Sequence, residues 1–266
     1  MSSEHRARKR FGQNFLHDTH VIQRIINAIN PGTKDRIVEI GPGKGALTRP
    51  LLEASGHLDV IELDRDLPPI LQAYCRGAGE LTIHSADAMK FDLATLINDN
   101  HKLRVVGNLP YNISTPLIFH LLDYCAVIQD MYFMLQKEVV ERLTAKPDNK
   151  SYGRLSIMVQ YHCQADYLFT VKPGSFTPVP KVDSAIVKLT PRPTPPVTVD
   201  NDDDFSLIIR AAFATRRKTL RNNLKEHLDT DLIQSLDIDP SRRAETISIE
   251  EFARLANCYS QTRTNR

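Results

Sequence analysis

A glycine-rich loop follows directly after an apolar, β-branched segment near the start of the chain. The segment is Arg36–Ile40, and it leads into Gly41-Pro42-Gly43-Lys44-Gly45 and then into a helix-like stretch over 46–54. A strand that is buried on both faces has a continuous apolar run, and parallel strands need a crossover connection, usually a helix. This order of segments therefore predicts a parallel α/β sheet.

Short apolar runs of the same kind recur up to residue 189, and helix-like stretches separate them. They lie at 36–40, 58–63, 81–84, 103–107, 128–135 and 183–189. A helix is expected over 18–30, where Asp18 can cap it and apolar residues repeat on one face. Together these patterns predict an α/β fold with an open, doubly wound sheet.

A proline-rich stretch divides the chain. Pro191–Thr198 holds four prolines in eight residues, which neither a helix nor a central strand tolerates. We therefore predict an α/β domain over 1–190 and a linker over 191–197. Beyond the linker, Phe205–Leu228 and Ile247–Asn257 have amphipathic helical patterns without strand signals. Residues 198–266 are expected to form a small helical domain.

The composition, with 41% hydrophobic and 25% charged residues, is that of a soluble globular protein. It excludes disordered and collagen-like classes. No apolar stretch approaches the length of a membrane-spanning helix, and the N-terminal sequence lacks the apolar core of a signal peptide, so we expect a cytoplasmic protein. The four cysteines form no C-x-x-C pair, so neither a disulfide framework nor a zinc site is expected.

Basic residues gather in two stretches that contain no acid, although the whole chain has a net charge of only +2. Local basic patches are typical of surfaces that bind a polyanion, because each neutralised phosphate releases counterions. A solvated helix face is the alternative for either cluster alone. The near-neutral total favours a monomer when no polyanion is bound. The candidate polyanion-binding residues are Arg6, Arg8, Lys9, Arg10, Arg216, Arg217, Lys218 and Arg221.

The position of the glycine-rich loop indicates a binding site for a nucleotide-type cofactor. The loop joins a strand to the N-terminus of a helix, where backbone N–H groups are free and glycines allow close approach. Gly41, Gly43 and Ala46 also fit the dinucleotide pattern G-x-G-x-x-G/A, so the glycines alone leave NAD and S-adenosylmethionine both open. A tight turn without a ligand is the structural alternative.

Acidic residues near the same strand ends narrow this choice. With Glu39 and Gly45 the loop has the pattern E-x-G-x-G-x-G, which resembles the first motif of S-adenosylmethionine methyltransferases. Glu62 ends the second strand and is placed to accept hydrogen bonds from ribose hydroxyls. Asp87 follows the third strand and is a candidate acceptor for an adenine amino group, although such an Asp alone is more typical of a surface turn.

The tetrapeptide Asn108-Leu109-Pro110-Tyr111 follows the predicted strand 103–107, at the edge where open α/β sheets bind ligands. The amine of a nucleobase, or a glutamine amide, is a poor nucleophile because its lone pair is delocalised. Asn108 and a backbone carbonyl, in a turn fixed by Pro110, would accept hydrogen bonds from the two N–H groups of the amine. These bonds would direct the nitrogen lone pair at a methyl group. Tyr111 would stack on the planar target. The alternative is an ordinary turn.

A second aromatic residue, Phe176, lies in Phe176-Thr177-Pro178-Val179-Pro180-Lys181-Val182-Asp183-Ser184. Two prolines hold this segment extended just before the last predicted strand. We expect Phe176 to close over the target on the face opposite Tyr111. Packing in the core is the alternative for a lone Phe.

Eight segments, spanning residues 12 to 223, resemble those of the small-subunit rRNA adenine N6-dimethyltransferases, the KsgA family. They are Gly12–Leu16, Glu39–Gly45, Ile61–Asp64, Asn108–Tyr111, Gln136–Val139, Tyr152–Ser156, Phe176–Ser184 and Arg216–Asn223. A minor departure is Pro68-Pro69, which suits a helix only if the helix begins there. The resemblance implies a Rossmann-like class I methyltransferase sheet with a small all-helical C-terminal domain.

The resemblance also implies the cofactor, the site and the substrate. It implies that two adjacent adenosines in the 3′-terminal hairpin loop of 16S rRNA each receive two methyl groups from S-adenosylmethionine. The substrate would be a late assembly intermediate of the 30S subunit, which the helical domain helps to dock, and no metal would be needed. The candidate cofactor residues are Asn14, Leu16, Gly41, Gly43, Gly45, Glu62, Asp87 and Asn108. The candidate catalytic residues are Asn108, Leu109, Pro110, Tyr111 and Phe176.

Three alternative functions share parts of this pattern. A relative that methylates large-subunit rRNA has the same loop and tetrapeptide, but Arg216–Asn223 and the helical tail favour the small-subunit reaction. Protein glutamine methyltransferases also use Asn-x-Pro-Tyr, yet they have little use for two basic segments. A ribosome-assembly or transcription factor without activity would not need Glu62, Asn108 and Tyr111.

Overall fold

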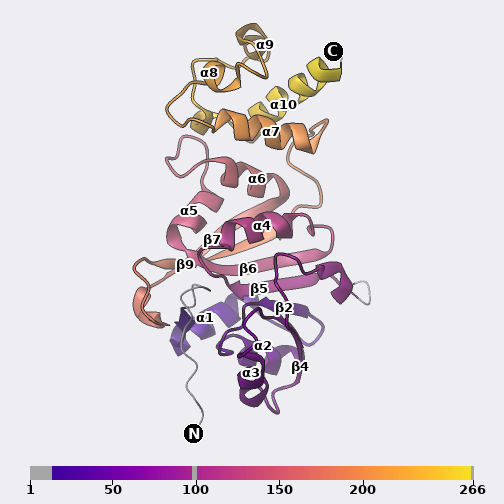
Figure 1. Cartoon of the computed structure of the whole chain (residues 1–266), viewed down its shortest axis with the longest axis vertical. Coiled ribbons are helices and arrows are strands. Elements are labelled where there is room, and N and C mark those ends of the chain that lie inside the picture. Colours follow the sequence, from indigo (N-terminus) through magenta and orange to yellow (C-terminus); the bar gives the residue numbers. More distant parts are fainter. Residues whose placement is uncertain (1–13, 98–100, 265–266) are drawn as a thin grey trace. The chain divides into compact units, whose positions relative to one another are not determined.

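The computed structural model describes residues 14–97 and 101–264, and the chain forms two compact units (Figure 1). The first consists of residues up to Val140 together with Ala165–Pro191. The second consists of Glu141–Gln164 together with the residues from Arg192 on. The chain thus changes unit next to the predicted linker 191–197. It also changes unit on either side of Glu141–Gln164, which the sequence patterns do not indicate.

A seven-stranded sheet in the order β4-β3-β2-β5-β6-β9-β7 organises the first unit. The strands from β2 to β6 are parallel, and β9 runs antiparallel to β6. The strands are β2 (Arg36–Ile40), β3 (His57–Ile61), β4 (Glu80–His84), β5 (Leu103–Asn108), β6 (Ile128–Gln136), β7 (Cys163–Val171) and β9 (Ser184–Pro191). The predicted α/β fold is confirmed, with the addition of β7, which the sequence patterns miss.

Most helices of this unit lie in the crossovers between the parallel strands, with one before β2 and one after β7. These helices are α1 (Thr19–Ile29), α2 (Thr48–Ser55), α3 (Pro68–Tyr74), η2 (Leu93–Leu96), α4 (Ser114–Leu122) and η3 (Pro173–Ser175), and α5 (Lys137–Thr144) leads out of the unit. A two-stranded ribbon pairs β1 (Phe15–Leu16) with β8 (Phe176–Thr177). Because α3 begins at Pro68, the two prolines occupy its first turn, where they cost no hydrogen bond.

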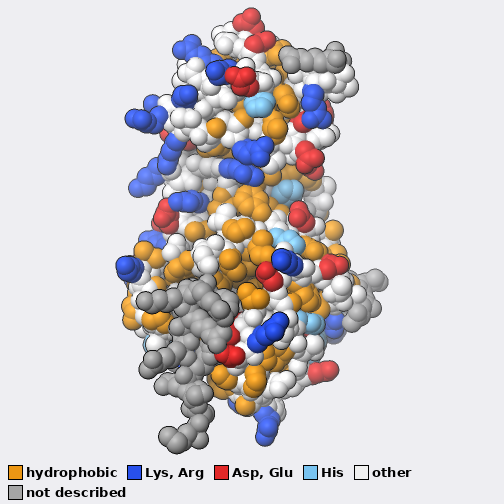
Figure 2. Space-filling model, viewed as in Figure 1, with side chains coloured by type: hydrophobic (Ala, Val, Ile, Leu, Met, Phe, Trp, Pro, Cys, Tyr) orange, Lys and Arg blue, Asp and Glu red, His pale blue; other side chains and the backbone are white. Residues whose placement is uncertain are grey.

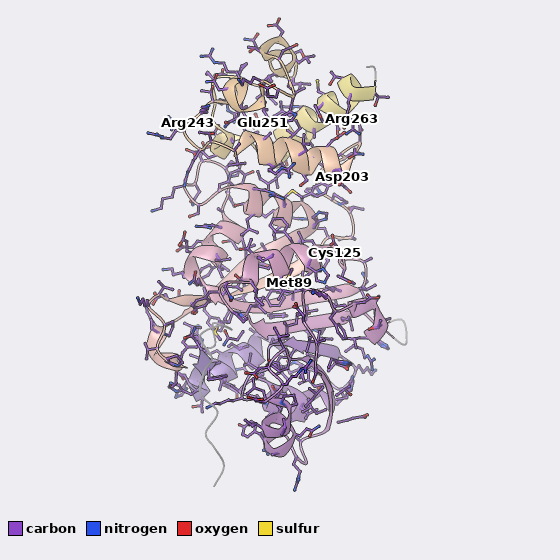
Figure 3. All side chains as sticks on the ribbon, in the orientation of Figure 1. Met89, Cys125, Asp203, Arg243, Glu251 and Arg263 are labelled. Carbon is purple, nitrogen blue, oxygen red and sulfur yellow. The ribbon has the colours of Figure 1, made fainter. Side chains whose placement is uncertain are left out.

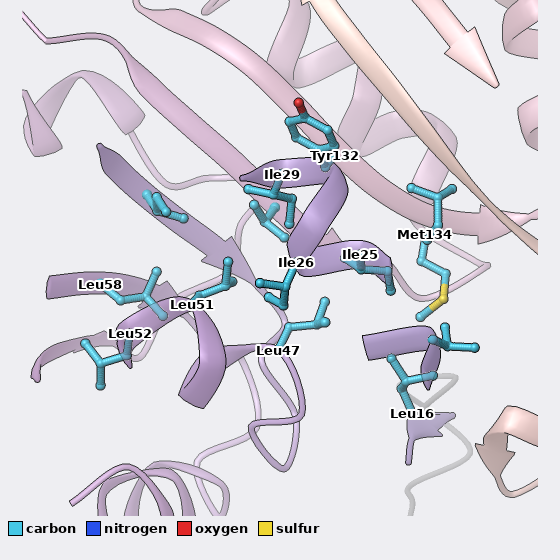
Figure 4. Packing of buried hydrophobic residues seen from close by; sticks show 14 of the residues in the cluster. Leu16, Ile25, Ile26, Ile29, Leu47, Leu51, Leu52, Leu58, Tyr132 and Met134 are labelled. Atoms are coloured by element: carbon cyan, nitrogen blue, oxygen red, sulfur yellow. The ribbon is translucent and has the colours of Figure 1, made fainter. Parts of the chain in front are cut away.

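Helix α1 shows how closely the local sequence determines the first unit. The Asp18 side chain accepts hydrogen bonds from the backbone N–H groups of His20 and Val21, which caps the N-terminus as predicted. Asn30 ends the helix in the left-handed conformation. The apolar face of α1 packs into a cluster with α2 and the central strands, where Leu51 and Leu52 are fully buried (Figure 4). The sheet edge that carries the glycine-rich loop therefore rests on a solid core.

A buried arginine ties the centre of the sheet to the end of α1. Arg104 on β5 is 6% exposed and donates to the Asp130 carboxylate on β6 at 2.9 Å. It also donates to Asp35 before β2 at 2.7 Å and to the Ile29 carbonyl at 2.7 Å. Each donated bond ends on a full charge or a carbonyl, so the guanidinium is satisfied without water.

The second unit is helical. Its elements after Arg192 are α7 (Asp202–Ala212), α8 (Leu220–Leu224), α9 (Thr230–Ser235), η4 (Ala244–Thr246) and α10 (Ile249–Thr264), and they pack with α6 (Arg154–His162). The single helix predicted over Phe205–Leu228 is wrong, because the chain turns at 213–219. The Asn223 side chain donates to the Ala212 and Thr215 carbonyls, which satisfies the end of α7. Figure 3 shows the side chains of both units.

No helix within the described ranges is long and apolar enough to cross a membrane. The same residues contain no group of three or more His, Cys, Asp or Glu side chains that is able to hold a metal ion.

Candidate active site

A pocket of about 340 Å³ opens in the first unit at the carboxyl ends of β2, β3, β4 and β5. This volume is within the range of small-molecule sites. The pocket lies where open α/β sheets bind their ligands, and all the residues that line it belong to the same unit. The lining includes all but one of the predicted cofactor residues, namely Asn14, Leu16, Gly41, Gly43, Glu62, Asp87 and Asn108, and also Leu109, Pro110 and Tyr111.

All three glycines of the loop have positive φ angles, which favour glycine. Gly41 and Gly45 differ in what surrounds them. A Cβ atom on Gly41 would meet nothing within 4 Å, so this position presents bare backbone to open space. A Cβ on Gly45 would lie 2.9 Å from the Tyr74 ring and 3.2 Å from Leu71 on α3. Gly45 is therefore placed for close packing against α3, and it is not among the residues that line the pocket. Its contact with the cofactor stays a prediction.

The Glu62 carboxylate is held at the pocket wall by backbone N–H groups. One of its oxygens accepts from Asp64 N at 2.8 Å, and the other accepts from Gly43 N at 3.3 Å. Burial raises the pKa of Glu62, and these two hydrogen bonds oppose the shift. Because a carboxylate has about four lone-pair sites, Glu62 retains acceptor capacity for a diol while its position is already set.

Asp87 forms a local turn and also faces the pocket. Its Oδ1 accepts from the backbone N–H of Met89 at 3.0 Å (Met89 is labelled in Figure 3). Asp87 therefore forms the turn that was the alternative to a ligand-binding role, and it also lines the pocket. The second oxygen retains its acceptor capacity.

The side chain of Asn108 is oriented by the arm that precedes α1. Asn108 Nδ2 donates to the Asn14 carbonyl oxygen at 3.0 Å. Since the amide nitrogen is used in this bond, Oδ1 is the atom available to accept a hydrogen bond from a ligand. The sequence indicated both residues, but no local pattern indicated that they bind each other across 94 positions.

Tyr111 is anchored at its hydroxyl group. The Tyr111 hydroxyl and Ser184 Oγ on β9 form a hydrogen bond of 3.0 Å. Ser184 is 1% exposed, so a group in the sheet fixes the orientation of the ring. Ser184 is a positioning residue that no sequence pattern marks as such, although it is the last residue of the segment Phe176–Ser184.

The Pro110 carbonyl is already used within the tetrapeptide turn. It accepts hydrogen bonds from Ile113 N at 3.2 Å and from Ser114 N at 3.1 Å, which begins α4. The Leu109 N–H donates to the Met134 carbonyl at 3.2 Å. These bonds hold the backbone of the turn against β6. The Leu109 carbonyl is therefore a candidate main-chain acceptor for a ligand within the tetrapeptide.

Phe176 does not have the place expected for a stacking residue. It is 1% exposed and packs in the same apolar cluster as Leu16 and Ile25. Phe176 also pairs with Leu16 across the β1–β8 ribbon, so the two side chains enter the core together. Core packing, the alternative expected for a lone Phe, describes this residue. Phe176 therefore holds in place the arm that carries Asn14 and Leu16.

The predicted basic cluster of the second unit is exposed. Arg216, Arg217 and Lys218 lie in the turn between α7 and α8, and Arg221 lies on α8. In Figure 2, Lys and Arg side chains are numerous on the side of this unit where Figure 1 shows α8. The other predicted cluster, Arg6, Arg8, Lys9 and Arg10, lies outside the described residues.

Two more cations join the exposed cluster through the fold. Arg216 donates to the Lys150 carbonyl and forms an ion pair with Glu245 at 3.5 Å, which brings the loop of Lys150 alongside. Arg243, labelled in Figure 3, pairs with Thr219 in an isolated β-bridge. Both Lys150 and Arg243 are exposed. Sequence patterns do not indicate them, because they come from separate segments.

Comparison with known proteins gives one consistent result. Residues 4–261 match the family model of ribosomal RNA adenine dimethylases. The ribosomal RNA small subunit methyltransferase A of Pseudomonas aeruginosa is 55% identical, over 99% of this chain and 98% of its own length. That of Saccharophagus degradans is 57% identical, over 95% and 94%.

Solved structures show the same fold. A dimethyladenosine transferase from Plasmodium falciparum superposes with a TM-score of 0.77 and is 27% identical, over 91% of this chain and 95% of its own. The 23S rRNA methyltransferase ErmE has a TM-score of 0.73 at 23% identity, over 93% of this chain and 100% of its own. The match to the family model and the identity to full-length relatives show that the chain belongs to the ribosomal RNA adenine dimethylase family.

Proposed function

We propose that this enzyme transfers methyl groups from S-adenosylmethionine to N6 of two adjacent adenosines in the 3′-terminal hairpin loop of 16S rRNA. Each adenosine receives two methyl groups, in a late assembly intermediate of the 30S subunit. The observation that carries the proposal is the position of Asn108. Its amide is fixed by Asn14, and its free oxygen faces the same pocket as the glycine-rich loop and Glu62.

The donor set of the pocket suits S-adenosylmethionine. Gly41 presents bare backbone, Glu62 offers carboxylate oxygens suited to a ribose diol, and Asp87 offers an acceptor suited to an adenine amino group. Asn14 and Leu16 close the pocket from the arm. When bound, S-adenosylmethionine supplies an electrophilic methyl group on a positively charged sulfur.

The tetrapeptide prepares the target amine for attack. Asn108 Oδ1 and the Leu109 carbonyl accept hydrogen bonds from the two N–H groups of the amine. The lone pair on the amine nitrogen is then no longer shared with the ring. These bonds strengthen as positive charge develops on the amine, and they therefore lower the barrier more than they tighten binding. Tyr111 supports the base with a ring that Ser184 holds in place. Once the amine has gained a methyl group and lost one proton to solvent, it retains one N–H bond, so the same groups serve the second transfer.

The exposed cations of the second unit supply contacts to the RNA backbone. Arg217, Lys218 and Arg221 are solvent-exposed, as phosphate-binding residues need to be, and Lys150 and Arg243 extend the cluster. Such contacts position the substrate without reading its sequence. The target base must be unstacked to enter the pocket, which favours a loop over a helix. The protein acts in the cytoplasm as a monomer that joins the subunit during assembly.

The relatives favour the small subunit over the large one. Those with 55% and 57% identity carry the name small subunit methyltransferase A, whereas the likeness to the 23S enzyme is one of fold. An assembly factor without activity is disfavoured, because the Asn108 and Tyr111 side chains are both held in place by hydrogen bonds.

Transfer of labelled methyl groups tests the proposal. Unmethylated 30S subunits, 50S subunits, free 16S rRNA and a protein with exposed glutamines are each incubated with the enzyme and labelled S-adenosylmethionine. We expect label in the small subunit, on two adjacent adenosines near the 3′ end, up to four methyl groups per subunit. Label confined to the large subunit or to protein, or no label at all, would overturn it.

A further inference from the structure

A second carboxyl group lines the pocket and has no evident task in the reaction described above. Glu39 lies on β2, two residues before Gly41, and is 2% exposed. The residue is part of the pocket lining. Its Oε2 atom has no hydrogen-bond partner among the described residues. A buried oxygen without a partner is costly, so this atom needs a proton or a ligand to satisfy it.

Glu39 is surrounded by apolar groups, an acid and uncharged polar groups. Glu62 faces it from the end of β3, and the buried Cys75 thiol faces it from the end of α3. The Thr48 hydroxyl at the start of α2 lies close to Glu39 and opposes the rise of its pKa. The neighbouring strand positions, Val60 on β3 and Val106 on β5, bring no charge.

The positively charged side chains near Glu39 contact groups other than Glu39. Lys44, in the loop, lies 5.0 Å from the centre of the Phe15 ring. Arg49 on α2 binds Glu53 at 2.8 Å and the Tyr74 carbonyl at 2.7 Å. Burial therefore dominates at Glu39, and it raises the pKa of this carboxyl to about 8. At neutral pH the free protein holds a proton on Glu39.

We propose that Glu39 releases its proton when a sulfonium ligand enters the pocket and regains one when the sulfonium becomes a sulfide, so that the protein distinguishes S-adenosylmethionine from S-adenosylhomocysteine. The inference rests on the proposed function and deepens it. The sulfonium carries a positive charge, and the sulfide that remains after methyl transfer does not. In a pocket of low dielectric constant, a nearby cation favours the carboxylate.

The consequence is a weaker hold on the product than on the methyl donor. With the donor, the Glu39 carboxylate is balanced by the sulfonium, and the proton goes to solvent. With the product, an ionised Glu39 would be a buried charge beside Glu62, so it takes up a proton from solvent instead. Charge on the protein thus follows charge on the ligand, and the product loses an attraction that the donor had.

Calorimetric titration of the whole protein in buffers of different ionisation enthalpy tests this inference. S-adenosylmethionine and S-adenosylhomocysteine are each titrated into the wild type, Glu39→Gln and the control Glu53→Gln, from about pH 6.5 to about pH 8.5. Glutamine keeps the shape of Glu39 but does not ionise, and Glu53 lies on the exposed face of α2. All proteins receive the same ligands, so titration of the ligands cancels in the comparison.

We expect the wild type and Glu53→Gln to release up to about one proton more per S-adenosylmethionine bound than Glu39→Gln at about pH 7. Below about pH 8, their affinity for the donor should rise with pH by up to about tenfold per unit relative to Glu39→Gln. The proteins should not differ in this way with S-adenosylhomocysteine. Equal proton release and equal pH dependence in the wild type and Glu39→Gln would overturn the inference.

A second measurement needs no variant. The infrared spectrum of the free wild type should contain the C=O band of a protonated carboxyl, which S-adenosylmethionine removes and S-adenosylhomocysteine does not. A band that survives both ligands contradicts the inference even if Glu39→Gln does not fold. Failure of the proposed function is a separate result, because an enzyme that methylates another substrate would still bind S-adenosylmethionine and release the same proton.

Discussion

The pocket of the first unit and the basic surface of the second are built on opposite principles. In the pocket, Glu62, Asn108 and Tyr111 are each fixed by a hydrogen bond to another part of the same unit. On the basic surface, Arg217, Lys218 and Arg221 are exposed. Chemistry at a single atom needs groups held within a few tenths of an ångström. Phosphate binding needs charge more than geometry, and it depends on salt.

The comparison also separates stability from function within the first unit. Some residues of the predicted motifs support the walls of the pocket from the core, as Phe176 and Gly45 do. Others face the pocket itself, as Gly41 and Asn108 do. Variants of the two kinds should therefore fail in different assays.

The largest effect is expected for Phe176→Ala. Its side chain is buried in the core cluster, and removal of such a ring costs about 3–5 kcal/mol of unfolding free energy. Chemical denaturation measures this loss. A variant that keeps its stability and loses only RNA binding would restore the stacking role predicted from the sequence and would contradict the core placement.

Asn108→Ala should fold normally and lose turnover. Loss of one acceptor that acts in the transition state costs about 10²–10³-fold in rate, or about 2.7–4 kcal/mol. Single-turnover methyl transfer to unmethylated small subunits measures the rate, and thermal denaturation reports the fold. Tyr111→Phe serves as a milder comparison, because it loses only the bond to Ser184. If Asn108→Ala reacted at the wild-type rate, the amine-binding role would be wrong.

Gly45→Ala and Gly41→Ala form a matched pair. Both place an alanine at a positive φ angle, which costs about 1–2 kcal/mol. Gly45→Ala also brings Cβ within 2.9 Å of Tyr74, and overpacking of this kind adds about 1–3 kcal/mol. Gly45→Ala should therefore be the less stable variant, and Gly41→Ala should be the one that weakens cofactor binding at modest loss of stability. The reverse order in melting temperature and cofactor affinity would show that the two roles are exchanged.

The smallest effect is expected for the double variant Arg217→Ala, Lys218→Ala. Methyl transfer from the bound complex should keep its rate, because neither residue lies in the pocket. Affinity for the small subunit should fall, and the slope of log affinity against log salt should flatten by about 0.7 for each phosphate that the variant no longer neutralises. The control Lys34→Ala, Arg76→Ala removes two exposed cations of the first unit. An equal slope change in both double variants would show that only total charge matters.

Local patterns predicted the elements that depend on neighbouring residues. The cap at Asp18, the loop after β2 and the tetrapeptide at the end of β5 lie where the sequence placed them. A strand, a turn and a helix start are each encoded within a few positions. Strand β7 escaped prediction because polar residues such as Gln164 and Asp166 interrupt it and it follows α6 without a turn.

What the sequence could not predict involves contacts between distant segments. The bonds from Asn108 to Asn14 and from Tyr111 to Ser184 join positions 94 and 73 residues apart. The burial of Phe176 depends on its pairing with Leu16, and the cations Lys150 and Arg243 reach the basic surface only through folding of the second unit. No periodicity or turn signal carries such information.

A crystal structure with S-adenosylhomocysteine and adenosine tests the central claim most directly. The account predicts that the ribose of S-adenosylhomocysteine lies at Glu62. It also predicts that the N6 atom of the separate adenosine lies about 3 Å from Asn108 Oδ1, with the sulfur on the side of that nitrogen opposite to Asn108. Density for S-adenosylhomocysteine outside this pocket, or an adenosine amine that contacts neither Asn108 nor Leu109, would contradict it.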